Sequence, residues 1–183
     1  QYDTVTEVMW VTGAALFIRL ADYREVGGLD DHFFAHMEEI DLCWRLRSRG
    51  KKLVCIPQSV VYHVGGATLK KENPRKTFLN FRNNLLMLYK NLPDKELEHV
   101  LFIRGILDRV AALVFYLKKD RANARAVMQA RREFEDIRYS FAASRIENMM
   151  KSTDEIIPER THFSIVMKYY LLGKKHFSQL KLF

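Results

Sequence analysis

The chain has 183 residues, of which 48% are hydrophobic and 28% are charged, and its formal net charge is +8. This composition is typical of a globular protein with an apolar core and excludes disorder as the default state of the chain. The positive excess is spread along the sequence and favours anionic partners, such as a nucleotide diphosphate, an anionic membrane surface or nucleic acid.

Two regions of different pattern follow each other along the chain. Residues 1–72 alternate short β-rich runs with turns and one helix, whereas 73–183 are almost entirely helical in pattern. Because the sequence begins at Gln1 and runs directly into an apolar segment, we expect it to be a piece of a longer protein. The longest apolar stretches, such as 8–18 and 110–117, are shorter than the roughly 18 to 20 residues that cross a bilayer.

In the first region the pattern predicts strands, turns and two helices in chain order. Glycines and a proline mark the breaks between them, and one segment has acids at its start and bases at its end, as helices prefer. The predicted elements are strands at 8–12 and 15–18, a short helix over 21–26 ended by Gly27 and Gly28, a helix over 38–49 ended by Gly50, and strands at 53–56 and 60–64.

Helical spacing dominates the second region, where it predicts helices over 74–91, 95–119, 122–141 and 163–172. The helix over 95–119 has an unusually wide apolar face and is followed by basic residues. Such a helix can lie on an anionic membrane, or it can pack against the other helices of this extension. Both interpretations fit the sequence.

Cys43 and Cys55 are the only cysteines, and they fall within a predicted helix and a predicted strand. We therefore expect free, buried thiols in a reducing compartment. A zinc site would need more ligands at closer spacing than the two cysteines, His36 and His63 provide.

The densest acidic cluster, His36-Met-Glu-Glu-Ile-Asp41, lies where the 38–49 helix begins. The dipole and free N–H groups of a helix start stabilise Glu38, Glu39 and Asp41 as anions. Many ordinary helices carry acids in their first turn, so the cluster alone is also compatible with a purely structural role. Two phenylalanines before it and an apolar, tryptophan-containing run after it favour a functional site.

The sequence around this cluster resembles the family 2 glycosyltransferases of the rhamnosyltransferase-like kind. Four blocks carry the resemblance in the same order and with short gaps: 11–19, 26–31, 33–45 and 49–68. The resemblance implies an α/β fold, in which 1–72 form the acceptor and catalytic portion of an incomplete GT-A domain, the C-terminal part of a nucleotide-diphospho-sugar transferase fold. Residues 73–183 would then be a mostly helical extension. The donor-binding half would be absent, so we expect the isolated chain to be inactive.

In that family the second acid of the leading pair is the general base, and the matching residue here is Glu39, where the family usually has Asp. Inverting transfer needs one carboxylate to take the proton of the acceptor hydroxyl as its oxygen attacks the anomeric carbon. The resemblance thus assigns catalysis to the acid cluster, with Glu39 as base and Glu38 and Asp41 beside it. Asp41 is also placed to form an ion pair with Arg45, four residues further along the helix.

Metal, donor and acceptor sites follow from the same resemblance. His63 matches a ligand of the divalent ion, Mg or Mn, that bridges the diphosphate, although a lone histidine after a strand is also compatible with a structural role. We expect it to share one cleft with Glu38 and Glu39. The diphosphate is assigned to Gly65 and Gly66, whose bare backbone allows close approach, and to Arg45. The acceptor is assigned to Gly13, Ala14 and Trp44, with a tight strand break as the other explanation of the Gly13 turn.

The predicted function is inverting transfer of a sugar from a nucleotide-diphosphate sugar to a hydroxyl of a glycan or lipid-linked acceptor. We expect a cytoplasmic protein, peripheral on the inner face of the membrane, in cell-wall or surface polysaccharide biosynthesis. The alternative is a non-catalytic helical module for interaction or membrane docking. Nucleic acid is not an expected partner, because the arginines of 121–145 alternate with acids and form no continuous basic stripe.

Overall fold

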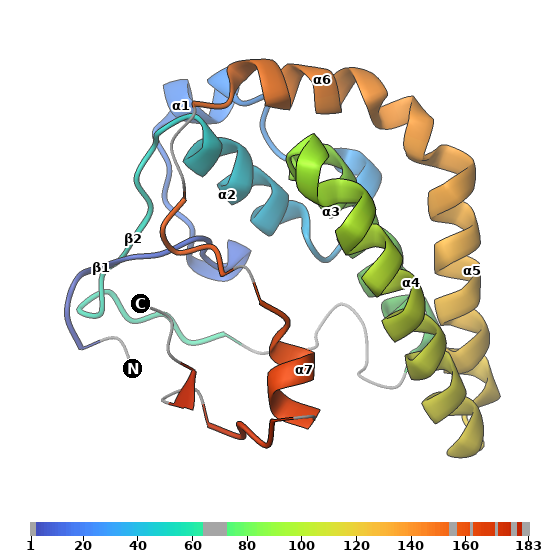
Figure 1. Cartoon of the computed structure of the whole chain (residues 1–183). Coiled ribbons are helices and arrows are strands. Elements are labelled where there is room, and N and C mark those ends of the chain that lie inside the picture. Colours follow the sequence, from blue (N-terminus) through green and yellow to red (C-terminus); the bar gives the residue numbers. More distant parts are fainter. Residues whose placement is uncertain are drawn as a thin grey trace.

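The computed structural model describes residues 3–63, 73–153, 157–161, 163–170, 172–176 and 179–180. A small sheet and short helices lie on one side, and a long helical hairpin lies on the other (Figure 1). The elements in order are β1 (Thr6–Glu7), the 3₁₀ turn η1 (Gly13–Ala15), α1 (Leu20–Glu25), the 3₁₀ turn η2 (Asp31–Phe33), α2 (Glu38–Ser48), β2 (Val54–Cys55), α3 (Pro74–Asn91), α4 (Asp94–Leu117), α5 (Arg121–Ile137), the 3₁₀ turn η3 (Arg138–Phe141), α6 (Ala142–Lys151) and α7 (Ile165–Tyr170).

The sheet is smaller than the sequence predicts. Strands β1 and β2 pair antiparallel, with Thr6 opposite Cys55 and Glu7 opposite Val54. The segments 8–12 and 15–18 are not strands but loops on either side of η1, and 60–63 form no strand either. A strand needs a neighbour for its backbone hydrogen bonds, and in the described part of the chain β1 and β2 pair only with each other.

Helices α1 and α2 confirm the predicted ones, and their glycine ends explain where they stop. Gly28 and Gly50 have φ values of +69° and +74°, a backbone region that favours glycine. At Gly28 a side chain would also collide with Tyr23, whose ring atoms lie 2.9 Å from the position of a Cβ. This close approach fixes the turn that leads toward the acid cluster.

Helix α3 has the predicted bounds and lies between α2 on one side and α5 and α6 on the other (Figure 1). The side chain of Asn73 accepts a hydrogen bond from the Arg75 amide at 2.9 Å, and Pro74 occupies the first turn. Both features favour a helix start. Because α3 is central, its buried face contributes Leu79, Leu85 and Leu86 to the core.

Helices α4 and α5 form a hairpin that an ion-pair cluster joins. Asp108 of α4 is buried and lies 2.9 Å from both Arg104 and Arg131, the latter from α5. The predicted helix over 122–141 is divided into α5 and the turn η3, and the predicted helix over 163–172 is shorter, as α7. Helix α6 was not predicted.

The core consists of two clusters of buried side chains. The larger one joins η2, α2, α3, α5 and η3 through residues such as Phe33, Leu85 and Phe134. The smaller one lies under β2 and includes Leu42, Leu46 and Cys43. Cys43 and Cys55 are free, as predicted, with Cys43 buried and Cys55 half-buried. None of the described helices is long and apolar enough to cross a membrane.

Candidate functional site

The acid cluster begins α2 directly after a backbone segment of unusual conformation. Phe34, His36 and Met37 all have positive φ values, of 60°, 70° and 75°. Residues other than glycine rarely adopt this region, which costs about 1–3 kcal/mol for each and is concentrated at functional sites. The surrounding structure must therefore hold this segment in place.

Asn83 of α3 provides that support. Its side chain is fully buried, and its amide nitrogen lies 2.8 Å from each of the carbonyl oxygens of Phe33, Ala35 and His36, which share its two N–H groups. One side chain thus satisfies the carbonyls of a loop that forms no regular structure. This role could not be predicted from the sequence, because a single asparagine in a helical pattern is usually solvent-exposed.

Glu39 lies half-buried at the centre of the cluster, and burial raises the pKa of its carboxyl group, so burial outweighs the stabilisation of the anion expected from the helix start. The charge of Glu38 raises this pKa further, whereas the backbone amide of Glu39 and the His36 ring oppose the shift. Glu39 Oε2, Glu38 Oε2 and His36 Nε2 are buried and have no hydrogen-bond partner among the described residues. Buried polar atoms in folded proteins are nearly always paired, so these three atoms from neighbouring residues require a partner, such as a water molecule or a ligand group.

The predicted acceptor residue Gly13 lies against this cluster. A Cβ added to Gly13 would be 3.8 Å from the Glu39 Cβ, and Gly13 and Ala14 are both exposed in η1. The Thr12 hydroxyl accepts a hydrogen bond from the Ala14 amide at 3.5 Å and closes this turn. The structure therefore brings Gly13, and with it η1, to the residue predicted as the base.

Asp41, by contrast, belongs to a buried polar network rather than to an accessible site. Its Oδ2 lies 2.8 Å from Arg45 Nη2 and 2.9 Å from Lys90 Nζ, and its Oδ1 accepts a hydrogen bond from Asn91 at 2.7 Å. The ion pair predicted between Asp41 and Arg45 is thus present. With both oxygens occupied and no exposure, Asp41 holds α2 in place, and the geometry does not favour a catalytic role for it.

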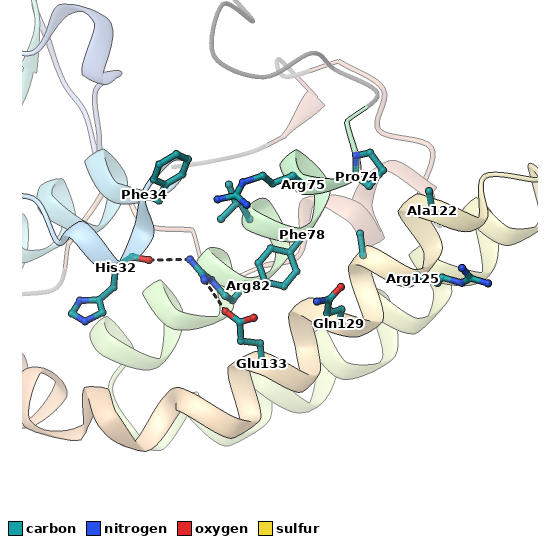
Figure 2. A pocket seen from close by; sticks show the side chains of 12 residues that line it. His32, Phe34, Pro74, Arg75, Phe78, Arg82, Ala122, Arg125, Gln129 and Glu133 are labelled. Atoms are coloured by element: carbon teal, nitrogen blue, oxygen red, sulfur yellow. Dashed lines mark hydrogen bonds and ion pairs between the residues drawn. The ribbon is translucent and has the colours of Figure 1, made fainter.

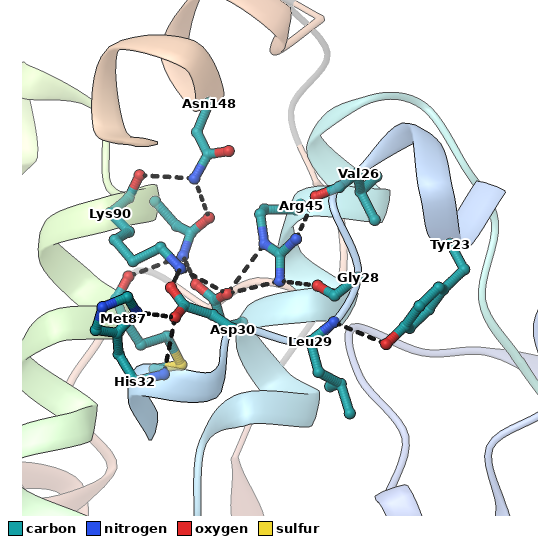
Figure 3. A network of polar contacts seen from close by, with 12 residues as sticks. Tyr23, Val26, Gly28, Leu29, Asp30, His32, Arg45, Met87, Lys90 and Asn148 are labelled. Atoms are coloured by element: carbon teal, nitrogen blue, oxygen red, sulfur yellow. Dashed lines mark hydrogen bonds and ion pairs between the residues drawn. The ribbon is translucent and has the colours of Figure 1, made fainter. Parts of the chain in front are cut away.

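Arg45, which the family resemblance assigned to the diphosphate, donates its hydrogen bonds within the same network. Besides Asp41, the guanidinium donates to the carbonyl oxygens of Val26 and Gly28, the latter at 2.8 Å (Figure 3). Trp44 is a core residue, only 8% exposed, with the Arg160 guanidinium 5.8 Å from its ring centre. Burial therefore argues against direct contact of Arg45 with a diphosphate and of Trp44 with an acceptor.

His63 is exposed, and within the described residues no contact joins it to Glu38 or Glu39. Gly65 and Gly66 lie outside the described residues. Among those that are described, one group of three potential metal ligands has its atoms within 4.8 Å of one another, namely Asp30, Asp31 and His32. Asp30 is at the same time 2.7 Å from the Lys90 ammonium, a cation already in place at this group.

A hollow of about 600 Å³ opens beside Phe34, the first residue of the segment with positive φ values, between η2, the start of α3 and α5 (Figure 2). Arg82 lines it but is engaged, 2.7 Å from Glu133 and 2.9 Å from the His32 carbonyl oxygen. Arg75 packs on the Phe34 ring at 5.3 Å, and neither it nor Arg125 has a carboxylate partner within the described part of the chain. The hollow thus presents cations and aromatic rings to solvent, a combination suited to an anionic ligand.

Comparison with known proteins gives relatives of one enzyme class. A pre-mycofactocin glycosyltransferase of Mycobacterium tuberculosis is 31% identical over 141 residues, which cover 71% of this chain and 29% of the relative. The N-acetylglucosaminyl-diphospho-decaprenol L-rhamnosyltransferase of that species is 38% identical over 56 residues, 31% of this chain and 18% of the relative. The rhamnosyltransferase WbbL of Escherichia coli K12 is 36% identical over 61 residues, 33% of this chain and 22% of the relative.

The chain is related to glycosyltransferases. It spans less than a third of the length of these relatives, at 29%, 18% and 22%. No family model matches this chain, and no solved structure matches it either.

Proposed function

We propose that this chain contributes the acceptor-activating part of an inverting, nucleotide-sugar-dependent glycosyltransferase of family 2, with a GT-A-type fold in the full-length protein. The observation that carries the proposal is Glu39, a half-buried carboxylate with a raised pKa and an unpaired oxygen, beside the exposed turn at Gly13. A carboxylate in such a position is suited to accept a proton near neutral pH. The names of the relatives support sugar transfer in general.

In the proposed reaction, Glu39 takes the proton of the acceptor hydroxyl while that oxygen attacks the anomeric carbon. The nucleotide diphosphate leaves from the opposite face of the sugar, which inverts the configuration at that carbon. Glu38 keeps the site anionic and, by its charge, makes Glu39 a stronger base. Asn83 and the buried network around Asp41 hold the start of α2 at a fixed position.

A divalent ion, Mg or Mn, is proposed to neutralise the leaving diphosphate, with His63 as one of its ligands. An exposed imidazole is available for this role. In this proposal the ion supplies charge neutralisation, so no second acid is needed for the leaving group. Titrating Mn into the full-length protein and its His63→Ala variant tests the ligand, since equal affinities would exclude it.

The acceptor is proposed to be a glycan or a lipid-linked sugar at the inner face of the membrane. One relative carries a diphospho-decaprenol acceptor in its name. The hollow with Arg75 and Arg125 is suited to the anionic part of such a molecule. Replacing both arginines by glutamine in the full-length protein should raise the KM for the lipid-linked acceptor and leave the KM for the nucleotide sugar unchanged.

The decisive experiment compares three variants of the full-length enzyme. Glu39→Gln keeps the size of the side chain and removes the proton acceptor, so turnover should fall by about 10² to 10⁴ while donor affinity stays close to normal. Glu38→Gln should be milder, and Asp41→Asn should mainly cost stability. Equal, small losses at Glu39 and Glu38 would mean that neither is the base, and a larger loss at Glu38 would move the assignment to that residue.

A further inference from the structure

Helix α4 has an apolar face that the described part of the chain leaves uncovered. Leu97, Gly105 and Ala112 are buried on the inner side of the helix, which packs on α5. On the outer side six apolar side chains are exposed, among them Leu117 at 70%: Phe102, Ile106, Val110, Leu113, Val114 and Leu117. Their spacing of three and four residues places them on one stripe, about 22 Å long at 1.5 Å for each residue. We call these six residues the α4 stripe.

Within 102–119 the exposed charges beside the α4 stripe have one sign, although Glu98, one turn before Phe102, is exposed and Asp120 caps the start of α5. Asp108 is the only acid between 102 and 119, and it is buried between Arg104 and Arg131. Arg109 flanks the stripe and is exposed, with Nη1 donating to the Gly105 carbonyl oxygen at 2.8 Å. Lys118 and Lys119 are exposed at its C-terminal end, and Arg121 follows at the start of α5. The exposed surface of 102–119 is thus apolar and cationic, with no exposed carboxylate.

We propose that the α4 stripe is a docking surface for an anionic lipid bilayer, on which α4 lies parallel to the membrane plane. The apolar side chains enter the interfacial layer, while Arg109, Lys118 and Lys119 contact lipid phosphates. In this proposal α4 lies on the bilayer surface and does not cross it. This inference rests on the membrane location of the proposed function and names the surface that provides it.

A second copy of the chain is a less suitable occupant of the stripe. Two-fold pairing of antiparallel helices places the symmetry axis near the middle of the stripe, between residues 109 and 110. The two Arg109 guanidiniums would then lie close together, with no exposed carboxylate in 102–119 to compensate them. Anionic headgroups supply the missing negative charge.

Vesicle co-sedimentation of the 183-residue chain tests the proposal. The chain should bind vesicles of phosphatidylcholine with about one third phosphatidylglycerol, bind pure phosphatidylcholine far less, and be released by salt. The double variant Leu113→Glu with Leu117→Glu should lose binding, because it places two carboxylates in the interface. Lys118→Gln with Lys119→Gln should weaken binding by about 25-fold, at about fivefold for each base.

Met150→Glu is the matched control, since Met150 is 80% exposed but lies on α6, outside the stripe. It should bind vesicles like the unaltered chain, and circular dichroism should show equal helix content for all variants. Three results would overturn the proposal: no binding to anionic vesicles, equal loss in the Met150 control, or a lipid-free dimer that the Leu113 and Leu117 changes dissociate. The assay measures no sugar transfer, so its failure leaves the proposed chemistry at Glu39 intact.

Discussion

At the scale of single residues, burial of Glu39 has two opposite effects: it makes the carboxylate a stronger base, and it makes the folded chain less stable when that carboxylate is charged. Burial raises the pKa of its carboxyl group, which means that folding favours the protonated form over the carboxylate. A carboxyl group of this kind contributes stability below its unfolded pKa, near 4.5, and this contribution is lost as the pH rises through the folded pKa. At neutral pH the charged form of Glu39 therefore lowers the free energy of unfolding.

Glu39→Gln should accordingly make the chain more stable at pH 7 although it removes the proposed base. The gain should disappear below pH 4.5, where the carboxyl group is protonated in both states. Urea denaturation of both proteins at several pH values measures this difference. Asp136→Asn, a change at an exposed position of α5, is the control and should have little effect. A loss of stability at pH 7 would show that the carboxylate is stabilised by its surroundings.

The same pKa shift predicts the pH dependence of the proposed sugar transfer by the full-length protein. The base acts only when deprotonated, so kcat/KM should rise with pH through the raised pKa of Glu39. This acid limb should lie above pH 4.5, the ordinary value for a glutamate. A Glu39→Asp variant should retain an acid limb, whereas Glu39→Gln should lose it. An unchanged limb in Glu39→Gln would assign it to another group.

Asn83 is the second residue whose substitution is informative. Asn83→Leu keeps the size of the side chain but leaves the carbonyl oxygens of Phe33, Ala35 and His36 without their donor. We expect a loss of about 1–3 kcal/mol in the free energy of unfolding, from the desolvated carbonyls. Asn80→Leu is the control, because among the described residues the Asn80 side chain donates to the Lys76 carbonyl oxygen alone, at 2.9 Å, within α3. Equal losses of unfolding free energy in both variants would show that Asn83 does not hold the loop in place.

At the scale of elements, the buried network fixes α2 against its neighbours. Asp30 and Asp41 carry two negative charges, and Arg45 and Lys90 carry two positive ones, so the four groups are balanced. Asn148 adds a link to α6 by donating to the Lys90 carbonyl oxygen at 3.2 Å. Because Lys90 lies near the end of α3, the network joins three helices around the start of the candidate site.

Asp41→Asn should be strongly destabilising, because it leaves Arg45 and Lys90 with one carboxylate fewer in a buried position. Breaking a buried ion pair by removing one partner costs about 3–5 kcal/mol. Asp31→Asn is the control, since Asp31 is exposed, and it should change stability little. Urea midpoints of the two variants decide the matter. A small effect at Asp41 would mean that water reaches the network.

The helices of the candidate site could be predicted from sequence because their ends carry local signals. Gly50 after α2 and Asn73-Pro74 before α3 are such signals, and both helices were predicted at nearly their observed bounds. Helix α6 was missed because η3 continues the helical pattern of α5 into it without a proline or glycine. The strands at 8–12 and 15–18 were wrong, since a strand depends on a neighbour that no local pattern reveals.

At the scale of the whole molecule, β1 and β2 lie far from α5 (Figure 1), and the segments that precede α1 and follow β2 expose apolar side chains of their own. Phe17 is 90% exposed and Tyr62 is 96% exposed. Phe17→Ser with Tyr62→Ser should lower the binding of a hydrophobic dye to the 183-residue chain and slow its aggregation, without changing its melting temperature. Unchanged dye binding would show that these side chains are covered in solution. The α4 variant Leu117→Glu provides a comparison for the other side.

The sequence predicted the acid cluster and the Asp41–Arg45 pair, because both lie within one helix, where spacing determines proximity. It did not predict that Lys90, Asn83 and Asn148 would complete the surroundings of α2. These residues lie 47 to 60 positions from their partners, and a single polar residue gives no indication of so distant a contact. The convergence of His63 with the acid cluster stays a prediction.

The link between α6 and the network has a consequence for the order of events during synthesis. Asn148 and Arg145 reach back to the carbonyl oxygens of Lys90 and Leu92, at 3.2 and 2.7 Å. A ribosome completes α2 about a hundred residues before it completes α6, and domains form as units while the chain emerges. The polar network at the end of α3 is therefore complete only when α6 has left the exit tunnel, and a nascent chain stalled before Ala142 lacks the contacts of Arg145 and Asn148.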